Sequence, residues 1–345
     1  MLERFSVPFG RIPESGFALE VRTGIYWIRM PLSYVLNHIN LWVIDDRENW
    51  TVVDTGTSTE ESKNVWHQIF ANFIDMRSIS RVFVTHMHPD HVGMAGWLTR
   101  KFSASLWMTR LEYLSCRVMV SDMEKEAPPE GTEFYRLAGW PESVIEIYKL
   151  QFDNFGKYIS KLPGNYRRII DGEKLTIGSQ QWLVITAGGH SPEHACFYCP
   201  ELKVLISGDL VLPRISSNVS VFATEPEANP MKDWLASLDR LEREIPDDVL
   251  VLPSHNEPFI GLHNRLKELR WEQIKKFQCL INTLSEPKRA IDVFDILFSR
   301  KINQEDISLF SLATGEAIAC LNYLMYEGRV KRSLGVDQVF WYEKI

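Results

Sequence analysis

The sequence predicts a layered α/β protein, and three observations support that class. Strand-like apolar runs alternate with helix-like segments over most of the chain. Hydrophobic residues make up 45% and charged residues 24% of the 345 residues, a balance that lets a globular chain bury a core. No stretch approaches the roughly 18 consecutive apolar residues of a membrane-spanning helix, and the N-terminal segment lacks the apolar core of a signal peptide.

The first 110 residues alternate between strands and helices. β-Branched and aromatic runs predict strands, whereas apolar residues at helical spacing predict helices. The predicted strands cover residues 24–30, 40–46, 51–56 and 81–86, and the predicted helices cover residues 60–73 and 90–102. This strand–helix–strand order indicates helices packed on sheets rather than an all-β barrel.

The rest of the chain divides into an insertion, a second set of strands and a C-terminal region. Charge clustering, prolines and helically spaced aromatic residues predict a helical insertion at residues 117–170, either a lid or a packed core element. The predicted strands that follow cover residues 174–178, 181–189, 203–209 and 248–255, with a helix at 231–244. Three helix-like segments and a hairpin then predict a winged-helix-like end. We therefore expect one domain at residues 1–265 and a small C-terminal domain at 266–345.

The sequence THMHPDHVG carries the strongest chemical signal. Three histidines and one aspartate lie within six positions, directly after an apolar strand: His86, His88, Asp90 and His91. The first two histidines point the same way in an extended turn, while Asp90 and His91 begin the following helix. Imidazole and carboxylate groups are the ligands that divalent metals prefer, zinc above all. The motif therefore predicts a metal site.

Three further strands end in side chains that bind metals. The runs WLVITAGG, VLISG and DVLVLPS are followed by His190, Asp209 and His255, respectively. In layered α/β proteins, sites assemble at the carboxyl ends of strands, where several loops converge. We therefore expect these three side chains to join the THMHPDHVG motif in one site.

The ordered pattern H-x-H-x-D-H, then His, Asp and His, resembles the metallo-β-lactamase superfamily, and the resemblance covers residues 1–265. It implies an αβ/βα four-layer sandwich with two divalent metal ions at one edge, zinc above all, with iron or manganese as alternatives. The implied ligands are His86, His88 and His190 for the first ion, Asp90, His91 and His255 for the second, and Asp209 bridging both. Asp54 would be a buried carboxylate that orients a ligand loop.

Asp209 directs the resemblance toward one branch of the superfamily. The zinc β-lactamases lack this bridging carboxylate, whereas the glyoxalase II-like dinuclear hydrolases carry it. That branch implies cleavage of a thioester or ester by a hydroxide bound between two metals, with Asp90 as the catalytic residue that orients it or accepts its proton. The C-terminal end is similar to a branch that includes acyl thioesterases and a mitochondrial endoribonuclease. From the thioesterases we expect a small-molecule acyl substrate. Ser254 and Asn256 stand where relatives more often carry glycines.

Three alternatives stay open at this level. The same metal pair suits an endoribonuclease or phosphodiesterase, although a net charge of −7 indicates no overall basic surface. A mononuclear iron enzyme similar to the persulfide dioxygenases shares H-x-H-x-D-H. A regulator that acts through the C-terminal domain is the non-enzymatic alternative. Its candidate recognition helix carries Glu316 and Glu327 and no basic residue, which argues against reading DNA.

Two loops beside the expected site supply candidate substrate contacts. Arg214, Ser216 and Asn218 follow the bridging aspartate, and Arg214 has the alternative role of neutralising carboxylates near the metals. Tyr34 lies in a loop that borders the site mouth in relatives, with packing at the sandwich edge as the alternative. We expect His194 behind the ligands or in the turn rather than on a metal.

Composition indicates the cellular setting. Five cysteines are few and odd in number, which is typical of reduced thiols in the cytoplasm. Cys196 and Cys199 have opposite parity on one strand, which predicts buried strand thiols rather than zinc ligands. The chain has 38 Lys and Arg against 45 Asp and Glu, so we expect no DNA and no membrane as partners. A homodimer stays open.

Overall fold

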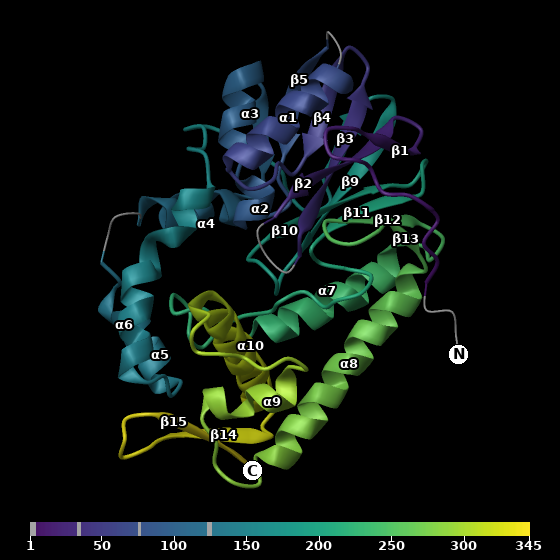
Figure 1. The fold of residues 1–345 in the computed structure, drawn as a ribbon. Coiled ribbons are helices and arrows are strands. Elements are labelled where there is room, and N and C mark those ends of the chain that lie inside the picture. Colours follow the sequence, from purple (N-terminus) through teal and green to yellow (C-terminus); the bar gives the residue numbers. More distant parts are fainter. Residues whose placement is uncertain (1–4, 33–35, 75–76, 123–125) are drawn as a thin grey trace.

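Two β-sheets pack face to face in the upper part of Figure 1, above α10 (Ile307–Tyr326) and the β14–β15 hairpin (residues 330–344). The computed structural model describes residues 5–32, 36–74, 77–122 and 126–345. The first sheet contains, in hydrogen-bonded order, β1 (Leu19–Arg22), β2 (Ile25–Pro31), β3 (His38–Asp46), β4 (Asn49–Val53), β5 (Ser78–Phe83), β6 (Ser105–Met108) and β7 (Arg167–Arg168). The second contains β13 (Phe259–Ile260), β12 (Leu250–Pro253), β11 (Val204–Gly208), β10 (His194–Cys199), β9 (Gln180–Ala187) and β8 (Lys174–Ile177).

Large apolar side chains from both sheets fill the space between them. Trp27 on β2 and Trp42 on β3 are buried and stack, with ring centroids 6.2 Å apart. Phe83 on β5 meets Phe197 on β10 edge to face across the sheets, with centroids 5.3 Å apart. Because side chains of a strand alternate between its two faces, the outer face of each sheet needs a cover of its own.

Helices supply that cover, so the protein has four layers. Outside the first sheet lie α1 (Glu60–Asn72) and α3 (Ala95–Phe102), whose buried faces share one apolar cluster with the strands. Outside the second sheet lie α7 (Pro230–Glu244) and α8 (Leu262–Thr283), which share another. This αβ/βα order confirms the predicted fold class.

The insertion begins earlier than predicted and ends in a strand. It contains α4 (Arg110–Ser121), α5 (Pro129–Leu137), α6 (Glu142–Gln151) and η1 (Phe152–Tyr158). The end of the predicted helical range 117–170 instead includes β7, which pairs in parallel with β6 at the edge of the first sheet. A two-residue strand has no periodicity of its own, so spacing does not reveal it.

Aromatic residues of the insertion pack on α10 (Ile307–Tyr326), near the end of the chain. Trp140 Nε1 donates a hydrogen bond of 2.9 Å to Thr314 Oγ1, and the Tyr135 hydroxyl hydrogen-bonds Ser311 Oγ. Both rings are buried. Figure 1 shows α4, α5 and α6 arching from the sandwich toward α10. These two aromatic residues are therefore part of a core, and a lid role for the insertion stays a prediction.

The C-terminal part has the expected order of helices followed by a hairpin. After α8 come η2 (Ala290–Val293), α9 (Phe294–Leu297) and α10, and then the paired strands β14 (Val330–Leu334) and β15 (Phe340–Lys344). The predicted boundary at 265–266 falls inside α8, and the division into two domains stays a prediction. Among the described helices, α10 alone is long and apolar enough to cross a membrane, and 72% of its apolar window is buried inside the protein, as in a core helix.

The two cysteines of β10 are buried on opposite faces of its sheet. Cys196 belongs to the apolar cluster beneath α7 and α8, whereas Cys199 belongs to the cluster between the sheets. Neither forms a disulfide. The prediction of buried strand thiols is confirmed.

Asp46 joins the two sheets, and replacing it with asparagine is expected to lower the free energy of unfolding by about 2 kcal/mol at pH 7. Its carboxylate accepts hydrogen bonds from Arg81 on β5 and, at 2.8 Å, from the Gly178 N–H beside β8. Burial opposes ionisation of Asp46, but these bonds and one from Thr51 lower its pKa overall. Chemical denaturation across a pH series measures the effect.

The pH dependence has a defined sign. Because the pKa of Asp46 is lower in the folded state, its contribution is present at neutral pH and is lost as the pH falls below about 4. The difference between the wild type and Asp46→Asn should therefore shrink in acid. Asp248→Asn, which breaks the exposed pair with Lys203, is the control and should leave stability unchanged. A constant difference down to pH 3 would refute the assignment.

Candidate metal centre

Several strands of the two sheets end at one edge of the sandwich, and each leads into a polar side chain. β4 and β5 are parallel neighbours in the first sheet, as are β11 and β12 in the second. Parallel neighbours end on the same side, so their loops converge. Asp54 follows β4, the THMHPDHVG loop follows β5, and His190, Asp209 and His255 follow β9, β11 and β12.

A short loop connects β5 to α2 (Pro89–Val92). The helix starts with a proline, which is favoured at the first position of a helix. A Cβ atom on Gly93, just after α2, would lie 2.4 Å from the Pro89 carbonyl oxygen and 2.6 Å from that of Gly56. Only glycine lets these segments pack so closely. This packing holds the ligand candidates of α2 beside the histidines at the end of β5.

Three imidazoles form the first group of candidate ligands. His86 Nε2 lies 2.9 Å from His88 Nδ1 and 3.1 Å from His190 Nε2. Burial, together with the neighbouring His190, lowers the pKa of His88 to about 3. Burial and the neighbouring histidines also hold the pKa of His86 well below its usual value. Neutral imidazoles that converge in this way present lone pairs to a single cation.

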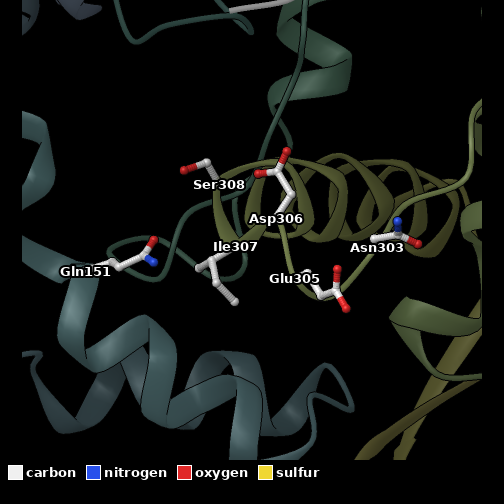
Figure 2. A pocket seen from close by; sticks show the side chains of 6 residues that line it. All are labelled: Gln151, Asn303, Glu305, Asp306, Ile307 and Ser308. Atoms are coloured by element: carbon white, nitrogen blue, oxygen red, sulfur yellow. The ribbon is translucent and has the colours of Figure 1, made fainter.

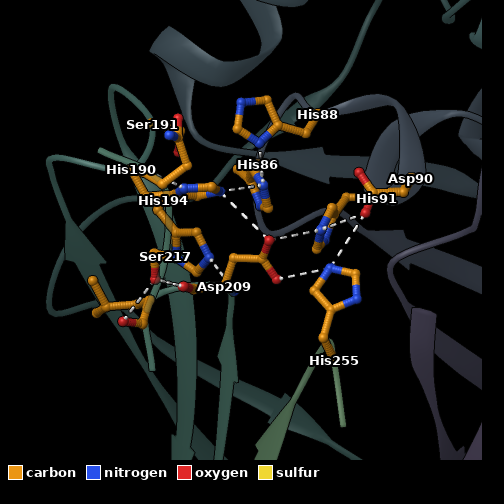
Figure 3. Close-up of polar contacts among 12 residues, drawn as sticks. His86, His88, Asp90, His91, His190, Ser191, His194, Asp209, Ser217 and His255 are labelled. Atoms are coloured by element: carbon orange, nitrogen blue, oxygen red, sulfur yellow. Dashed lines mark hydrogen bonds and ion pairs between the residues drawn. The ribbon is translucent and has the colours of Figure 1, made fainter. Parts of the chain in front are cut away.

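Asp209 joins this first group to a second. Its Oδ2 lies 3.5 Å from both His190 Nε2 and His91 Nε2, and its Oδ1 lies 3.5 Å from His255 Nε2 (Figure 3). Asp90 Oδ2 lies 3.5 Å from His91 Nε2 and 3.4 Å from His255 Nε2. A carboxylate placed between two groups of nitrogen ligands has the position needed to bridge two cations.

Opposite charges are paired in the second group. Burial disfavours a charged His255, but Asp209 and Asp90 outweigh burial and raise its pKa to about 10. Burial likewise opposes ionisation of Asp209, yet His255 and His91 hold its pKa well below its usual range. Asp209 is therefore ionised at neutral pH, the form in which a carboxylate binds divalent cations.

Asp54 and Thr85 hold two of the imidazoles from behind. Asp54 Oδ2 lies 2.8 Å from His91 Nδ1, and Thr85 Oγ1 lies 3.0 Å from His86 Nδ1. Asp54 also accepts a hydrogen bond of 2.8 Å from the Thr85 N–H, and its own backbone has φ 61°. Because these contacts occupy Nδ1, each ring turns Nε2 toward the cluster.

Two backbone carbonyls hold His190 and His255 in the same way, so that Nε2 of each ring faces the cluster. His190 Nδ1 lies 2.7 Å from the Asn218 carbonyl oxygen, and His255 Nδ1 lies 3.0 Å from that of His38. All four rings therefore follow one rule, in which a fixed Nδ1 contact aims Nε2 inward. Neither carbonyl has a sequence pattern that would have identified it.

His194 lies behind the cluster. Its Nε2 accepts a hydrogen bond of 3.2 Å from the Asp209 N–H, so it fixes the backbone of the bridging residue. Gly208 precedes that residue with φ 53°, and a Cβ atom there would lie 2.3 Å from His194 Nε2. Glycine is thus required for this approach.

The donor set fits divalent metal ions. Among the described residues, two buried atoms of the cluster, His91 Nε2 and Asp209 Oδ1, have no hydrogen-bond partner, although buried polar atoms are normally satisfied. Three sets of ligand atoms each lie within 4.8 Å of one another: His86, His88 and His190; His86, His91 and Asp209; Asp90, His91 and His255. Nitrogen and carboxylate donors at this spacing suit the metals expected from the sequence.

All seven predicted ligands lie in this cluster, and Asp54 lies directly behind it. The structure thus brings together side chains from four loops, and their role as ligands stays a prediction. Of the predicted substrate contacts, Tyr34 lies outside the described residues. Ser216 and Arg214 are exposed, and Arg214 Nε lies 3.0 Å from Glu257 Oε2.

Asn218, the last predicted substrate contact, has its side chain engaged within the protein. Its Nδ2 donates a hydrogen bond of 3.0 Å to Glu316 on α10, and its Oδ1 accepts one of 2.6 Å from Ser220. Its contact with the site is the carbonyl that holds His190. A direct contact with substrate stays a prediction for Asn218, Arg214 and Ser216.

Glu112 is the buried acid that the sequence did not single out. It lies in the first turn of α4, is fully buried, and accepts hydrogen bonds from the loops that carry the first group of histidines. Burial raises its pKa to about 7, although those hydrogen bonds act in the opposite direction. Its spacing follows no metal-ligand pattern, so nothing local distinguishes it from a surface glutamate.

A separate hollow of about 480 Å³ lies between α6 and the start of α10 (Figure 2). Its lining is polar and partly acidic: Gln151, Asn303, Glu305, Asp306, Ile307 and Ser308. None of these six residues belongs to the three candidate metal sets of the described chain. The hollow is therefore separate from the histidine–aspartate cluster.

Comparison with known proteins points to one family. The sequence matches the metallo-beta-lactamase superfamily over residues 35–255 and the metallo-beta-lactamase-like C-terminal domain over residues 277–345. It is 23% identical to a probable metallo-hydrolase of Bacillus subtilis (strain 168), over 81% of this chain and 86% of that protein. It is 24% identical to an acyl-coenzyme A thioesterase of Homo sapiens, over 68% of this chain and 79% of that protein.

Two solved structures resemble the whole chain. A beta-lactamase domain protein from Burkholderia ambifaria superposes with a TM-score of 0.91 at 37% identity, over 99% of this chain and 98% of that one. A metallo-beta-lactamase family protein from Thermus thermophilus superposes with a TM-score of 0.79 at 27% identity, over 94% and 100% of the two chains. The likeness therefore includes the C-terminal helices and hairpin as well as the sandwich.

Proposed function

The chain belongs to the metallo-β-lactamase superfamily of hydrolases, and on this basis we propose that it cleaves a thioester or ester of a small acyl substrate with two divalent ions, zinc above all. One observation carries the proposal. Asp209 lies 3.5 Å from nitrogen atoms of both ligand groups, through Oδ2 to His190 and through Oδ1 to His255. A carboxylate in that position favours two ions over one.

The side chains of this chain would divide the work as follows. His86, His88 and His190 would hold one ion, and Asp90, His91 and His255 the other, with Asp209 between them. When bound, such a pair lowers the pKa of a water molecule and polarises the bond under attack. Asp90 is the more open carboxylate, with 22% of its side chain exposed against 11% for Asp209. On this basis Asp90 would orient an incoming water and accept its proton.

The choice of a thioester is supported by similarity. The human relative is an acyl-coenzyme A thioesterase, and its likeness covers 68% of this chain. RNA cleavage, the competing reaction, requires phosphate contacts along a basic surface, and the net charge of the chain is −7. We therefore propose a thioester as the substrate and use RNA as the comparison substrate in the assay.

His88→Ala is expected to lower kcat/KM for a thioester by at least about 10³-fold, because the first ion loses one of its three imidazoles. Release of free thiol from a panel of acyl-coenzyme A substrates measures the rate, and elemental analysis measures the bound metal. His67→Ala is the matched control, because His67 is exposed on α1 and packs on Phe70 and Trp97. It should keep the wild-type rate.

Two outcomes would overturn the proposal. Cleavage of single-stranded RNA by the wild type, lost in His88→Ala and without thioester cleavage, would assign the site to phosphodiester hydrolysis. One iron per chain with consumption of oxygen would replace hydrolysis by oxygen chemistry.

A further inference from the structure

Glu112 lies between two ligand loops and bonds to both. Its Oε2 accepts a hydrogen bond of 2.8 Å from the Met87 N–H. Its Oε1 accepts one of 2.7 Å from Ser191 Oγ and one of 2.8 Å from the Glu193 N–H. The side chain is fully buried, so no water competes for these three donors.

The two loops come from different sheets. Met87 follows β5 of the first sheet and stands between the candidate ligands His86 and His88. Ser191 follows β9 of the second sheet and comes directly after His190. One carboxylate therefore joins the sheets at the point where the first group of imidazoles meets.

The helix that carries Glu112 is itself anchored to the second loop. The Leu111 N–H at the start of α4 donates a hydrogen bond of 2.8 Å to Glu193 Oε2, and Thr109 Oγ1 donates one of 2.7 Å to the Glu193 carbonyl oxygen. A carboxylate at the start of a helix is stabilised by the free N–H groups there. Glu112 thus acts from a rigid support rather than from a mobile loop.

The second ligand group is held by other residues. Asp54 holds His91, and the His38 carbonyl holds His255. Among the described contacts of Glu112, none reaches this group. Thr85 Oγ1 contacts both His86 and His91, so the two halves share one support, whereas the described contacts of Glu112 serve the first half.

We propose that Glu112 is a positioning residue that keeps His86, His88 and His190 in register for one ion and leaves the affinity for the second ion nearly unchanged. The inference rests on the two-ion site of the proposed function. Residues that hold metal ligands from behind contribute about tenfold to 100-fold in metal affinity. Glu112 bonds to the Met87 N–H between His86 and His88 and to the Ser191 hydroxyl beside His190, so a loss within that range is expected.

The test is a titration of the metal-free full chain with Co²⁺, followed by its visible absorption, and with Zn²⁺ against a competing chelator. Glu112→Gln keeps the volume of the side chain, but an amide N–H₂ replaces one of its two acceptor oxygens. At least one donor of the ligand loops therefore loses its acceptor. We expect the affinity for one ion to fall about 10-fold to 100-fold, with a changed Co²⁺ spectrum, and the affinity for the other to change less than about threefold.

A second variant keeps the test informative if Glu112→Gln folds poorly. Ser191→Ala removes one of the three donors and should weaken the same ion by about threefold to tenfold. Because Ser191 acts through Glu112, the double variant should bind no more weakly than Glu112→Gln alone. Tyr113→Phe is the matched control, since the neighbouring Tyr113 hydroxyl donates a partly buried hydrogen bond of 2.7 Å to the Pro163 carbonyl, away from the ligand loops.

The outcomes separate this inference from the proposed function. Equal weakening of both ions, or no weakening of either, would overturn the role of Glu112. A wild type that binds ions but cleaves no thioester would overturn the substrate proposal and leave the Glu112 comparison valid. If the wild type binds a single ion, Glu112→Gln must weaken that ion, and an unchanged affinity would again overturn the inference.

Discussion

Asp209→Ala is expected to remove both ions and to lower kcat/KM for a thioester by at least about 10⁴-fold. The Asp209 carboxylate lies 3.5 Å from ring nitrogens of both groups, namely those of His190, His91 and His255. Its removal takes a ligand from each ion and leaves less negative charge to offset two dications. Elemental analysis of the purified variant and a thioester assay measure the two effects.

The expected effect of Asp209→Ala comes from the position of Asp209 between the two ligand groups, and not from the loss of one acidic residue as such. Asp171→Asn is the control, because Asp171 pairs with Arg240 at the surface, with its Oδ1 2.9 Å from the Arg240 Nη1. It should retain two ions and the wild-type rate. Asp209→Ala with two ions per chain would contradict a bridging role.

Removal of metal by a chelator is expected to stop hydrolysis completely and to lower the melting temperature. An ion present at 1,000 times its Kd stabilises the folded state by about 4 kcal/mol. For a chain of 345 residues, that corresponds to a shift of roughly 5 °C. The metal-free protein is expected to be less stable because buried atoms of the cluster, such as His91 Nε2 and Asp209 Oδ1, then lack hydrogen-bond partners.

Scanning calorimetry with and without chelator measures the shift, and addition of Zn²⁺ should restore both stability and rate. The Asp209→Ala variant is the control, because a chain that binds no ion should have a melting temperature independent of chelator. A wild type whose melting temperature ignores both chelator and added Zn²⁺ would contradict a metal-loaded cluster.

The ligand loops were predictable because their chemistry is local. The THMHPDHVG motif places two histidines in a turn and an aspartate and a histidine on the next helix, and the structure shows that arrangement. His190, Asp209 and His255 each follow a strand of the second sheet. Strand ends converge in layered α/β folds, so their meeting could also be expected.

The supports of the ligands were predictable only in part. Asp54 was expected behind the cluster through family resemblance, and it contacts His91. The carbonyls of His38 and Asn218 carry no side-chain signal, because every residue has a carbonyl. The insertion shows the same limit, since the short strand β7 exists only through its pairing with β6.

Periodicity and spacing are properties of neighbouring residues, so the amino-acid sequence predicted the layered α/β class, most of the strands and helices, and the residue types at the strand ends. The αβ/βα order came from the family resemblance. The groups that support the cluster from distant parts of the chain could be identified only in the folded protein. Glu112 meets Ser191 across 79 positions of the chain, and His255 meets the His38 carbonyl across 217. Such contacts depend on how two sheets and an inserted helix pack together, and no local pattern encodes that packing.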